Sequence, residues 1–202
     1  MIKYLLPAML LACAPSKLDV EDGEVSEYPE SVDTSGAIET PTEFGVIEED
    51  DCDQTELGSS VCNMVLYDQN ENVWQLYDHA GKIIILDFST AWCYPCQVAG
   101  MSTQKIQDDY AGDVVFATLL IEGTTGAPTT HEDVVTWVEE HNVTNAPVLR
   151  ASRDYVMDPE GITGYLVGGY PTYVYIGRDM KIATAHVGFT EEYVRTVLDG
   201  LL

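Results

Sequence analysis

The sequence predicts an α/β fold in which helices cover both faces of a central mixed β-sheet, preceded by an N-terminal extension. Two nearly continuous apolar runs, residues 82–88 and 113–121, are typical of strands that are buried on both faces. A helical pattern follows each run, and the chain ends in a hairpin and a last helix. Strands that alternate with helices in this order favour a mixed sheet with helices on both sides.

The composition fits one domain of ordinary size and argues against two classes of partner. The 202 residues are 46% apolar, and 34 Asp and Glu stand against 9 Lys and Arg, for a formal net charge of −25. Such an excess of acid argues against nucleic-acid binding, which needs cations to neutralise phosphates. It also argues against adhesion to an anionic bilayer through a basic patch. The five cysteines are an odd number, so one of them stands apart from any set of intrachain pairs.

Residues 1–12 are expected to be a lipoprotein signal peptide. One cation precedes a short apolar run, far shorter than the roughly 20 residues that a membrane-spanning helix needs. The end of the run, Leu10-Leu11-Ala12-Cys13, resembles the bacterial lipobox, and this resemblance implies that Cys13 is lipidated and becomes the new N-terminus. The protein would then be held in the bacterial cell envelope, facing the periplasm or extracytoplasmic space. The alternatives are an ordinary signal peptide and a buried segment with an incidental cysteine.

The next segment, residues 13–57, is expected to be a disordered acidic tether. Residues 18–57 contain 15 Asp and Glu and no Lys or Arg, so they bury too little apolar surface to offset the entropy of ordering. Ala14 lacks the acidic character of an inner-membrane retention signal, which favours the outer membrane in a Gram-negative cell. Binding of calcium or of a partner by the acidic cluster at 48–53 is an alternative, but no spaced calcium-loop pattern is present.

Residues 58–202 are expected to fold as one domain that opens with two strands and a helix. Residues 73–77 follow a polar turn and are rich in β-formers, so they predict a strand. A turn at Gly81 leads into the buried run at 82–88, which predicts the second strand. Residues 97–110 then have the pattern of a helix.

The second half of the domain continues this alternation. The run at 113–121 predicts a buried strand, and Thr130 with Asp133 three residues later is typical of the start of a helix over 131–141. The remaining expected elements are a short strand at 147–149, a hairpin of strands 172–176 and 181–187, and a last helix that Thr190 caps.

A cysteine pair, Trp92-Cys93-Tyr94-Pro95-Cys96, lies where the first buried strand meets the first long helix. Unpaired N–H groups and the helix dipole at such a position favour a thiolate over a thiol. With two residues between them, the cysteines can close a small redox-labile disulfide. A structural disulfide and half of a zinc site are alternatives. Zinc usually takes two closely spaced ligand pairs, and Cys52 and Cys62 lie ten positions apart, so we expect no metal.

Two motifs resemble the thioredoxin superfamily. Residues 87–96, Asp-Phe-Ser-Thr-Ala-Trp-Cys-Tyr-Pro-Cys, resemble its active-site strand–helix junction, and residues 169–172, Gly-Tyr-Pro-Thr, resemble its cis-proline loop. Pro171 follows Cys93 by 78 residues (171 − 93), a longer spacing that is similar to the lipoprotein or membrane-anchored TlpA/ResA-type, redoxin-like branch. The resemblance covers about residues 61–202. It implies a thioredoxin-like fold and a thiol–disulfide oxidoreductase.

The resemblance also implies the roles of four catalytic residues. Cys93 would be the attacking thiolate, and Cys96, one turn deeper, would resolve the mixed disulfide. Asp87 lies in an apolar run, where burial raises the pKa of a carboxyl group, so it could accept the proton of Cys96. A water-exposed Asp87 at the end of its strand is the alternative. Pro171, as a cis-proline, would remove a backbone donor beside the disulfide and turn the neighbouring backbone towards the substrate.

Four further residues are expected to contact the substrate. Trp92 would shield the disulfide, although ordinary core packing is its alternative. Tyr94 would be an exposed intervening residue, Pro95 resembles the residue found in reducing centres of the family, and Tyr170 would present its backbone to the substrate. Glu122 ends the second buried run, near where related extracytoplasmic reductases place an active-site acid.

Cys52 and Cys62 are the natural structural disulfide once Cys13 is lipidated and the other two cysteines form the active pair. Two unpaired thiols are improbable in an oxidising compartment, and a second redox pair is the remaining alternative.

The favoured function is that of a disulfide reductase that acts on protein thiols and disulfides as a monomer, with no cofactor and an electron donor that the sequence does not name. The alternatives are a peroxiredoxin-like thiol peroxidase and a non-catalytic interaction module on the same fold. The peroxidase shares a Thr-x-x-Cys fragment with residues 90–93, but Leu86 stands where that family has a proline.

Overall fold

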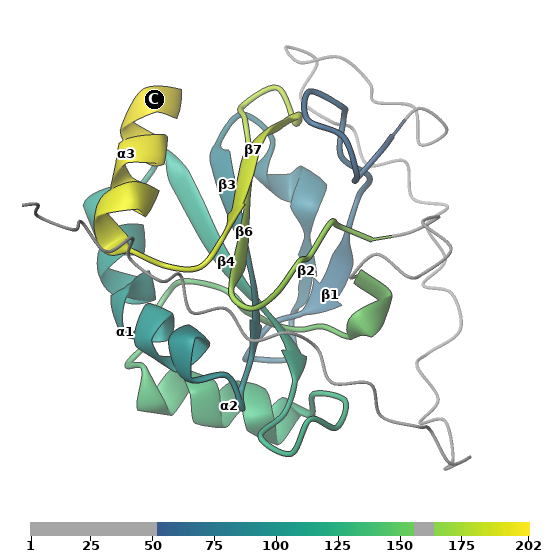
Figure 1. The fold of residues 1–202 in the computed structure, drawn as a ribbon, viewed down its shortest axis with the longest axis vertical. Coiled ribbons are helices and arrows are strands. Elements are labelled where there is room, and N and C mark those ends of the chain that lie inside the picture. The colour runs from purple at the N-terminus through teal and green to yellow at the C-terminus, as the bar shows by residue number, and fades with distance from the viewer. Residues whose placement is uncertain (1–51, 156–163) are drawn as a thin grey trace, which may run out of the picture.

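Strands and helices alternate along the chain in the computed structural model, which describes residues 52–155 and 164–202 (Figure 1). Within these residues, seven strands form one sheet of order β2-β1-β5-β4-β3-β6-β7. The elements are β1 (Val65–Tyr67), β2 (Val73–Gln75), the 3-10 helix η2 (Leu76–His79), β3 (Ile83–Thr90), α1 (Tyr94–Asp109), β4 (Val114–Glu122), α2 (His131–Glu140), β5 (Val148–Arg150), the 3-10 helix η3 (Arg153–Tyr155), β6 (Thr172–Ile176), β7 (Ile182–Val187) and α3 (Glu191–Leu201).

The sheet is mixed, as the sequence predicts. Strand β3 pairs in parallel with β4 and antiparallel with β6, and β4 pairs in parallel with β5. Every residue of β3 and β4 is buried, which is expected of central strands with helices on both faces. The predicted α/β fold class is therefore confirmed.

Alternate side chains of β3 point into two separate apolar clusters. Ile83 and Ile85 pack in the cluster that α1 and α3 cover, whereas Leu86 and Phe88 pack in the cluster that includes Trp137 of α2. Helices α1 and α3 therefore lie on one face of the sheet, side by side in Figure 1, and α2 lies on the other face. This two-sided burial follows from the alternation of side chains along a strand.

Helix α1 also meets the end of α2 closely, at Gly100. A Cβ atom there would lie 2.5 Å from Cδ2 of His141, so only glycine fits. The His141 ring is held on both sides: Nδ1 lies 2.8 Å from the carbonyl oxygen of Trp137, and Nε2 lies 3.1 Å from that of Gln97. The C-terminal end of α2 is thereby fixed against the first turns of α1.

Several predicted boundaries differ from the structure for identifiable reasons. The first long helix starts at Tyr94, three residues before the predicted start at 97, because Pro95 in the first turn is compatible with a helix. The predicted strand at 73–77 ends at Gln75, and the buried Leu76 and Tyr77 belong to a 3-10 helix instead. Strand β1 was not predicted. Thr130 and Thr190 cap their helices as expected, and Thr130 forms a complete capping box.

Residues just before 58 lie against the domain. A disulfide joins Cys52 to Cys62, with an S–S distance of 1.97 Å. The N–H of Asp53 donates to the carbonyl of Ser60 at 2.8 Å, and that of Gly58 donates to the carbonyl of Ile182 at 2.8 Å. The chain is thus tied to the start of β7 from Cys52 onward. Cys13, the predicted signal peptide and most of the predicted tether lie outside the described residues.

None of the helices in the described ranges combines the length and the apolar character that crossing a membrane requires.

Candidate active site

Cys93 occupies the N-cap of α1, directly after the turn that follows β3. Its backbone is extended, with φ −86° and ψ 111°, and its N–H donates to the carbonyl of Thr90 at 3.2 Å. The thiol is buried, and Sγ donates to the carbonyl oxygen of Tyr170 at 3.5 Å. The side chain therefore lies between the positive end of a helix dipole and the loop before β6.

Cys96 lies in the first turn of α1 and is also fully buried. Both cysteines are present as thiols. Burial raises the pKa of Cys96 far above its ordinary value, and its hydrogen bond with Cys93 raises it further. The Cys96 thiol therefore keeps its proton near neutral pH, and a base must remove that proton before the sulfur can attack a disulfide.

Asp87 lies inside β3 with no exposed surface, which excludes the alternative of a water-exposed carboxylate at the end of the strand. The Ser89 hydroxyl donates to one carboxyl oxygen at 2.8 Å, and the Thr118 hydroxyl donates to the other at 3.4 Å. Burial raises the pKa of Asp87 to about 7; the two hydroxyls lower it and the charge on Cys93 raises it. Asp87 can therefore take up or release a proton near neutral pH.

The loop before β6 supplies the opposite wall of the site. The Tyr170–Pro171 peptide bond is cis, and the Thr172 hydroxyl donates to the carbonyl of Gly169 at 2.6 Å. Tyr170 is buried, and its ring meets that of Trp92 edge-on at a centroid distance of 6.2 Å. Burial, followed by the nearby charge of Glu122, raises the pKa of Tyr170 to about 12. The ring is therefore neutral at physiological pH and forms an apolar wall.

The four residues expected to contact substrate differ in exposure. Tyr94 is 74% exposed, Trp92 and Pro95 are half-buried, and Tyr170 presents only its carbonyl to Cys93. The ring of Trp92 packs against the main core cluster. The structure thus brings all four next to the cysteine pair, and Tyr94 is the one that solvent reaches freely.

Glu122 and Arg153 form a charged pair at the edge of the site. Glu122 ends β4 with a side chain only 3% exposed, and one of its oxygens accepts a 2.6 Å hydrogen bond from Nε1 of Trp92. Nε and Nη2 of Arg153 both contact the other oxygen. Sequence reasoning missed Arg153, which lies beyond the end of β5 without any motif. The buried carboxylate of Glu122 thereby links the half-exposed Arg153 to Trp92, the residue before Cys93.

Within the described ranges, no group of three or more His, Cys, Asp or Glu side chains is arranged to hold a metal ion.

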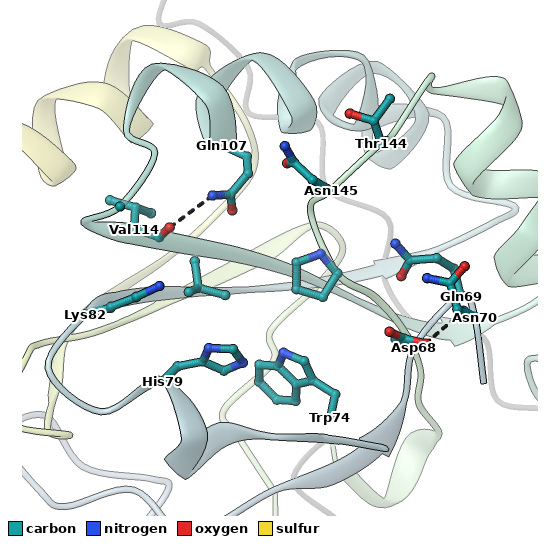
Figure 2. Close-up of a pocket in the computed structure, with 13 residues that line it drawn as sticks. Asp68, Gln69, Asn70, Trp74, His79, Lys82, Gln107, Val114, Thr144 and Asn145 are labelled. Carbon is teal, nitrogen blue, oxygen red and sulfur yellow. Dashed lines mark hydrogen bonds between the residues drawn. The ribbon is translucent and has the colours of Figure 1, made fainter. Parts of the chain in front are cut away.

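A cavity of about 360 Å³ lies at the other end of the parallel strands (Figure 2). Lys82 precedes β3 and Val114 begins β4, whereas Cys93 follows the end of β3, so the cavity is distinct from the cysteine pair. Figure 2 shows the ring of Trp74 beside that of His79, and their centroids are 5.0 Å apart.

Comparisons with known proteins converge on one class. No protein-family model matches the chain. A thioredoxin of Coprinus comatus is 30% identical over 110 residues, which make up 54% of this chain and 90% of that protein. The thioredoxin-like protein YneN of Bacillus subtilis is 28% identical over 126 residues, 61% of this chain and 68% of that protein. The structure of the pneumococcal exposed lipoprotein thioredoxin of Streptococcus pneumoniae is 25% identical with a TM-score of 0.56, covering 69% of this chain and 100% of that one.

The raised pKa of Asp87 predicts a pH-dependent stability. The pKa of an Asp side chain is 3.8 in an unfolded chain, and burial raises that of folded Asp87 to about 7, so only the folded state holds the proton between these values. The stabilisation that the raised pKa of Asp87 gives the folded state is therefore fully present below about pH 4 and is lost as the pH rises through 7. We expect Asp87→Asn to raise the free energy of unfolding by roughly 2–4 kcal/mol at pH 8 and to change it little at pH 4. Urea titrations across this range measure the difference.

The control is the exposed Glu132→Gln, which should leave in place the pH dependence of the unfolding free energy that Asp87 contributes. If Asp87→Asn keeps the wild-type slope of unfolding free energy against pH, this result would contradict the assignment of the raised pKa to Asp87.

Removal of the Arg153 charge is expected to destabilise the fold, because it leaves the buried carboxylate of Glu122 without its cation. We expect Arg153→Gln to lower the free energy of unfolding by about 1–3 kcal/mol at pH 7. The matched change Arg178→Gln, in the exposed pair with Asp113, should cost only about 0–1 kcal/mol. Adding Glu122→Gln to Arg153→Gln should restore more than half of the loss. Equal losses of unfolding free energy in Arg153→Gln and Arg178→Gln would show that the pair of Arg153 with Glu122 stabilises the fold no more than an exposed ion pair does.

Proposed function

We propose that this chain, which belongs to the thioredoxin family, is an extracytoplasmic, lipid-anchored reductase of protein disulfides. Membership rests on 30% identity to a thioredoxin of which the chain covers 90%. The observation that carries the activity is the pair of thiols at the N-terminus of α1, with Cys93 against the carbonyl of Tyr170 and Cys96 buried one turn deeper. Thiol–disulfide exchange is the chemistry that such a pair performs.

Exchange proceeds in two steps. The Cys93 thiolate, stabilised by the N-terminus of α1, attacks one sulfur of the substrate disulfide. The substrate S–S bond breaks, a mixed disulfide forms on Cys93, and the other substrate sulfur leaves and takes up a proton. Cys96 then attacks Sγ of Cys93, which releases the second substrate thiol and leaves a Cys93–Cys96 disulfide. Two electrons have passed to the substrate, and a dithiol donor returns them.

Asp87 supports the second step as the acceptor of the Cys96 proton. The raised pKa of Cys96 makes direct attack slow, and the charge of Asp87 contributes to that increase, so the two groups interact electrostatically. With a pKa of about 7, Asp87 accepts the proton as the thiolate forms and can release it in the next cycle.

The direction and the location rest on the sequence and on one relative. Pro95 before Cys96 resembles the reducing centres of the TlpA/ResA-type branch. The pneumococcal relative is described as an exposed lipoprotein, in agreement with the lipobox-like Leu10-Leu11-Ala12-Cys13. The Cys52–Cys62 disulfide suits an oxidising compartment outside the cytoplasm.

The activity is tested by the cysteine variants of the full chain, with insulin as the disulfide substrate and dithiothreitol as the electron source. Cys93→Ser should abolish turnover, and Cys96→Ser, incubated with insulin in the absence of dithiothreitol, should accumulate a mixed disulfide that non-reducing gels and mass spectrometry detect. The matched double change Cys52→Ser with Cys62→Ser should retain the dithiol activity. Undiminished turnover in Cys93→Ser would rule out the mechanism, and peroxide consumption far above disulfide turnover would favour a peroxidase.

The anchor is tested separately by Cys13→Ser in a bacterial host that processes lipoproteins. The wild-type chain should be found with the membranes and carry the mass of a diacylglyceryl group, whereas Cys13→Ser should be recovered without it. Cys52→Ser is the control for a general effect of cysteine removal. An unmodified wild-type N-terminus after cleavage would contradict lipid anchoring and leave the exchange chemistry untouched.

A further inference from the structure

Three apolar side chains form an exposed ridge on α1 that begins beside the reactive cysteine: Tyr94, Val98 and Met101. They are 74%, 40% and 70% exposed, respectively. Their spacing of four and three residues places them on one face of the helix. We call these three residues the α1 ridge. It starts at the residue next to Cys93 and ends before Lys105, which pairs with Glu191.

The α1 ridge plays no part in the core. Helix α1 buries the opposite side, through residues that include Ala99, Thr103 and Ile106. Polar residues at Val98 and Met101 would serve that packing equally well and would avoid exposing apolar surface to water. Contiguous exposed apolar side chains next to a reactive group are typical of an interaction surface.

Carboxylates of α3 flank the ridge on one side. The Ser102 hydroxyl of α1 donates to Glu191 at 3.3 Å, which places the start of α3 against the middle of α1. Glu192, the next residue, is exposed. The cations in this region, Lys105 and Arg195, are both engaged with Glu191 and Asp109.

Carboxylates of α2 flank the ridge on the other side. The ring of His141 contacts the carbonyl of Gln97, so the C-terminal end of α2 lies next to the first turns of α1. Glu139 and Glu140 directly precede His141 and are exposed. The ends of α2 and α3 that adjoin α1 therefore both carry exposed carboxylates, Glu139 and Glu140 on α2 and Glu192 on α3, which we call the acidic borders.

We propose that the α1 ridge docks an extended segment of a partner protein that carries the exchanging cysteine, with apolar residues beside that cysteine and Lys or Arg around them. The inference rests on the proposed exchange at Cys93. From Tyr94 to Met101 the ridge spans about 10 Å of helix, which three or four residues of extended chain cover. The acidic borders select basic flanks through charge complementarity. They also disfavour a second copy of this chain, because its own acidic borders would face them.

The test compares two disulfide-linked peptide dimers. Each monomer carries one Cys and the sequence Leu-Phe-Leu, followed by Lys-Lys in one peptide and Glu-Glu in the other. The full chain should reduce the Lys peptide with a KM about tenfold lower than that for the Glu peptide. Replacing Val98 and Met101 together by Ser should raise the KM for the Lys peptide about tenfold while kcat changes little. Hydroxyethyl disulfide, which is too small to cover the ridge, normalises each preparation for active dithiol.

The control variant is Val73→Ser on the distant edge strand β2, where an apolar side chain is similarly exposed at 51%. It should leave both KM values unchanged. The triple change Glu139→Gln, Glu140→Gln and Glu192→Gln should bring the ratio of the two KM values close to one, and 0.5 M NaCl should do the same to the wild-type chain.

Three results would overturn the inference: an unchanged KM in the double variant, the same increase in Val73→Ser, or equal KM values for the two peptides in the wild-type chain. A wild-type dimer that dissociates in the double variant would also overturn it, by assigning the ridge to self-association. Failure of the wild-type chain to reduce insulin is a separate result, which would overturn the proposed function itself.

Discussion

Complete burial of β3 between two paired strands positions the groups of the proposed chemistry. The strand carries Asp87 in its interior and leads through a short turn to Cys93. Its neighbour β6 brings Thr172 opposite Phe88, which sets the preceding cis-proline loop beside the cysteine. Its neighbour β4 ends with Glu122 at the level of Thr90. A shift in either register would separate these groups, and because one residue of slip would turn every side chain of the strand to the other face, the core resists such a shift.

Two buried carboxyl groups in this site have opposite electrostatic situations. Asp87 accepts hydrogen bonds from two neutral hydroxyl groups and lies near Cys93, and burial, the largest effect, raises its pKa to about 7. Glu122 is met by the guanidinium of Arg153 and by the indole N–H of Trp92, both of which stabilise a negative charge. The two buried carboxyl groups therefore differ in their partners, which are neutral hydroxyls for Asp87 and a cation with an indole N–H for Glu122.

Much of the fold followed from local sequence patterns, whereas the network around the cysteines did not. The apolar runs identified β3 and β4 because central strands need no polar face, and Thr130 and Thr190 marked helix starts through cap chemistry. Strand β1 was not predicted, although β2 and β5, which are equally short, were. The contact of Arg153 with Glu122 bridges 31 positions and has no spacing rule, so only the packing of η3 against the end of β4 reveals it. The exposure of Val98 and Met101 likewise depends on which side of α1 the sheet occupies.

The N-terminal segment of the described chain is attached at the end of the domain opposite the cysteine pair. Residues from Cys52 to Val61 are tied to the turn of the β6–β7 hairpin and the start of β7, while the cysteine pair lies at the far end of β3, beside the start of β6 (Figure 1). A pull transmitted along the chain from its N-terminal side therefore acts on the end of the domain that is remote from Cys93.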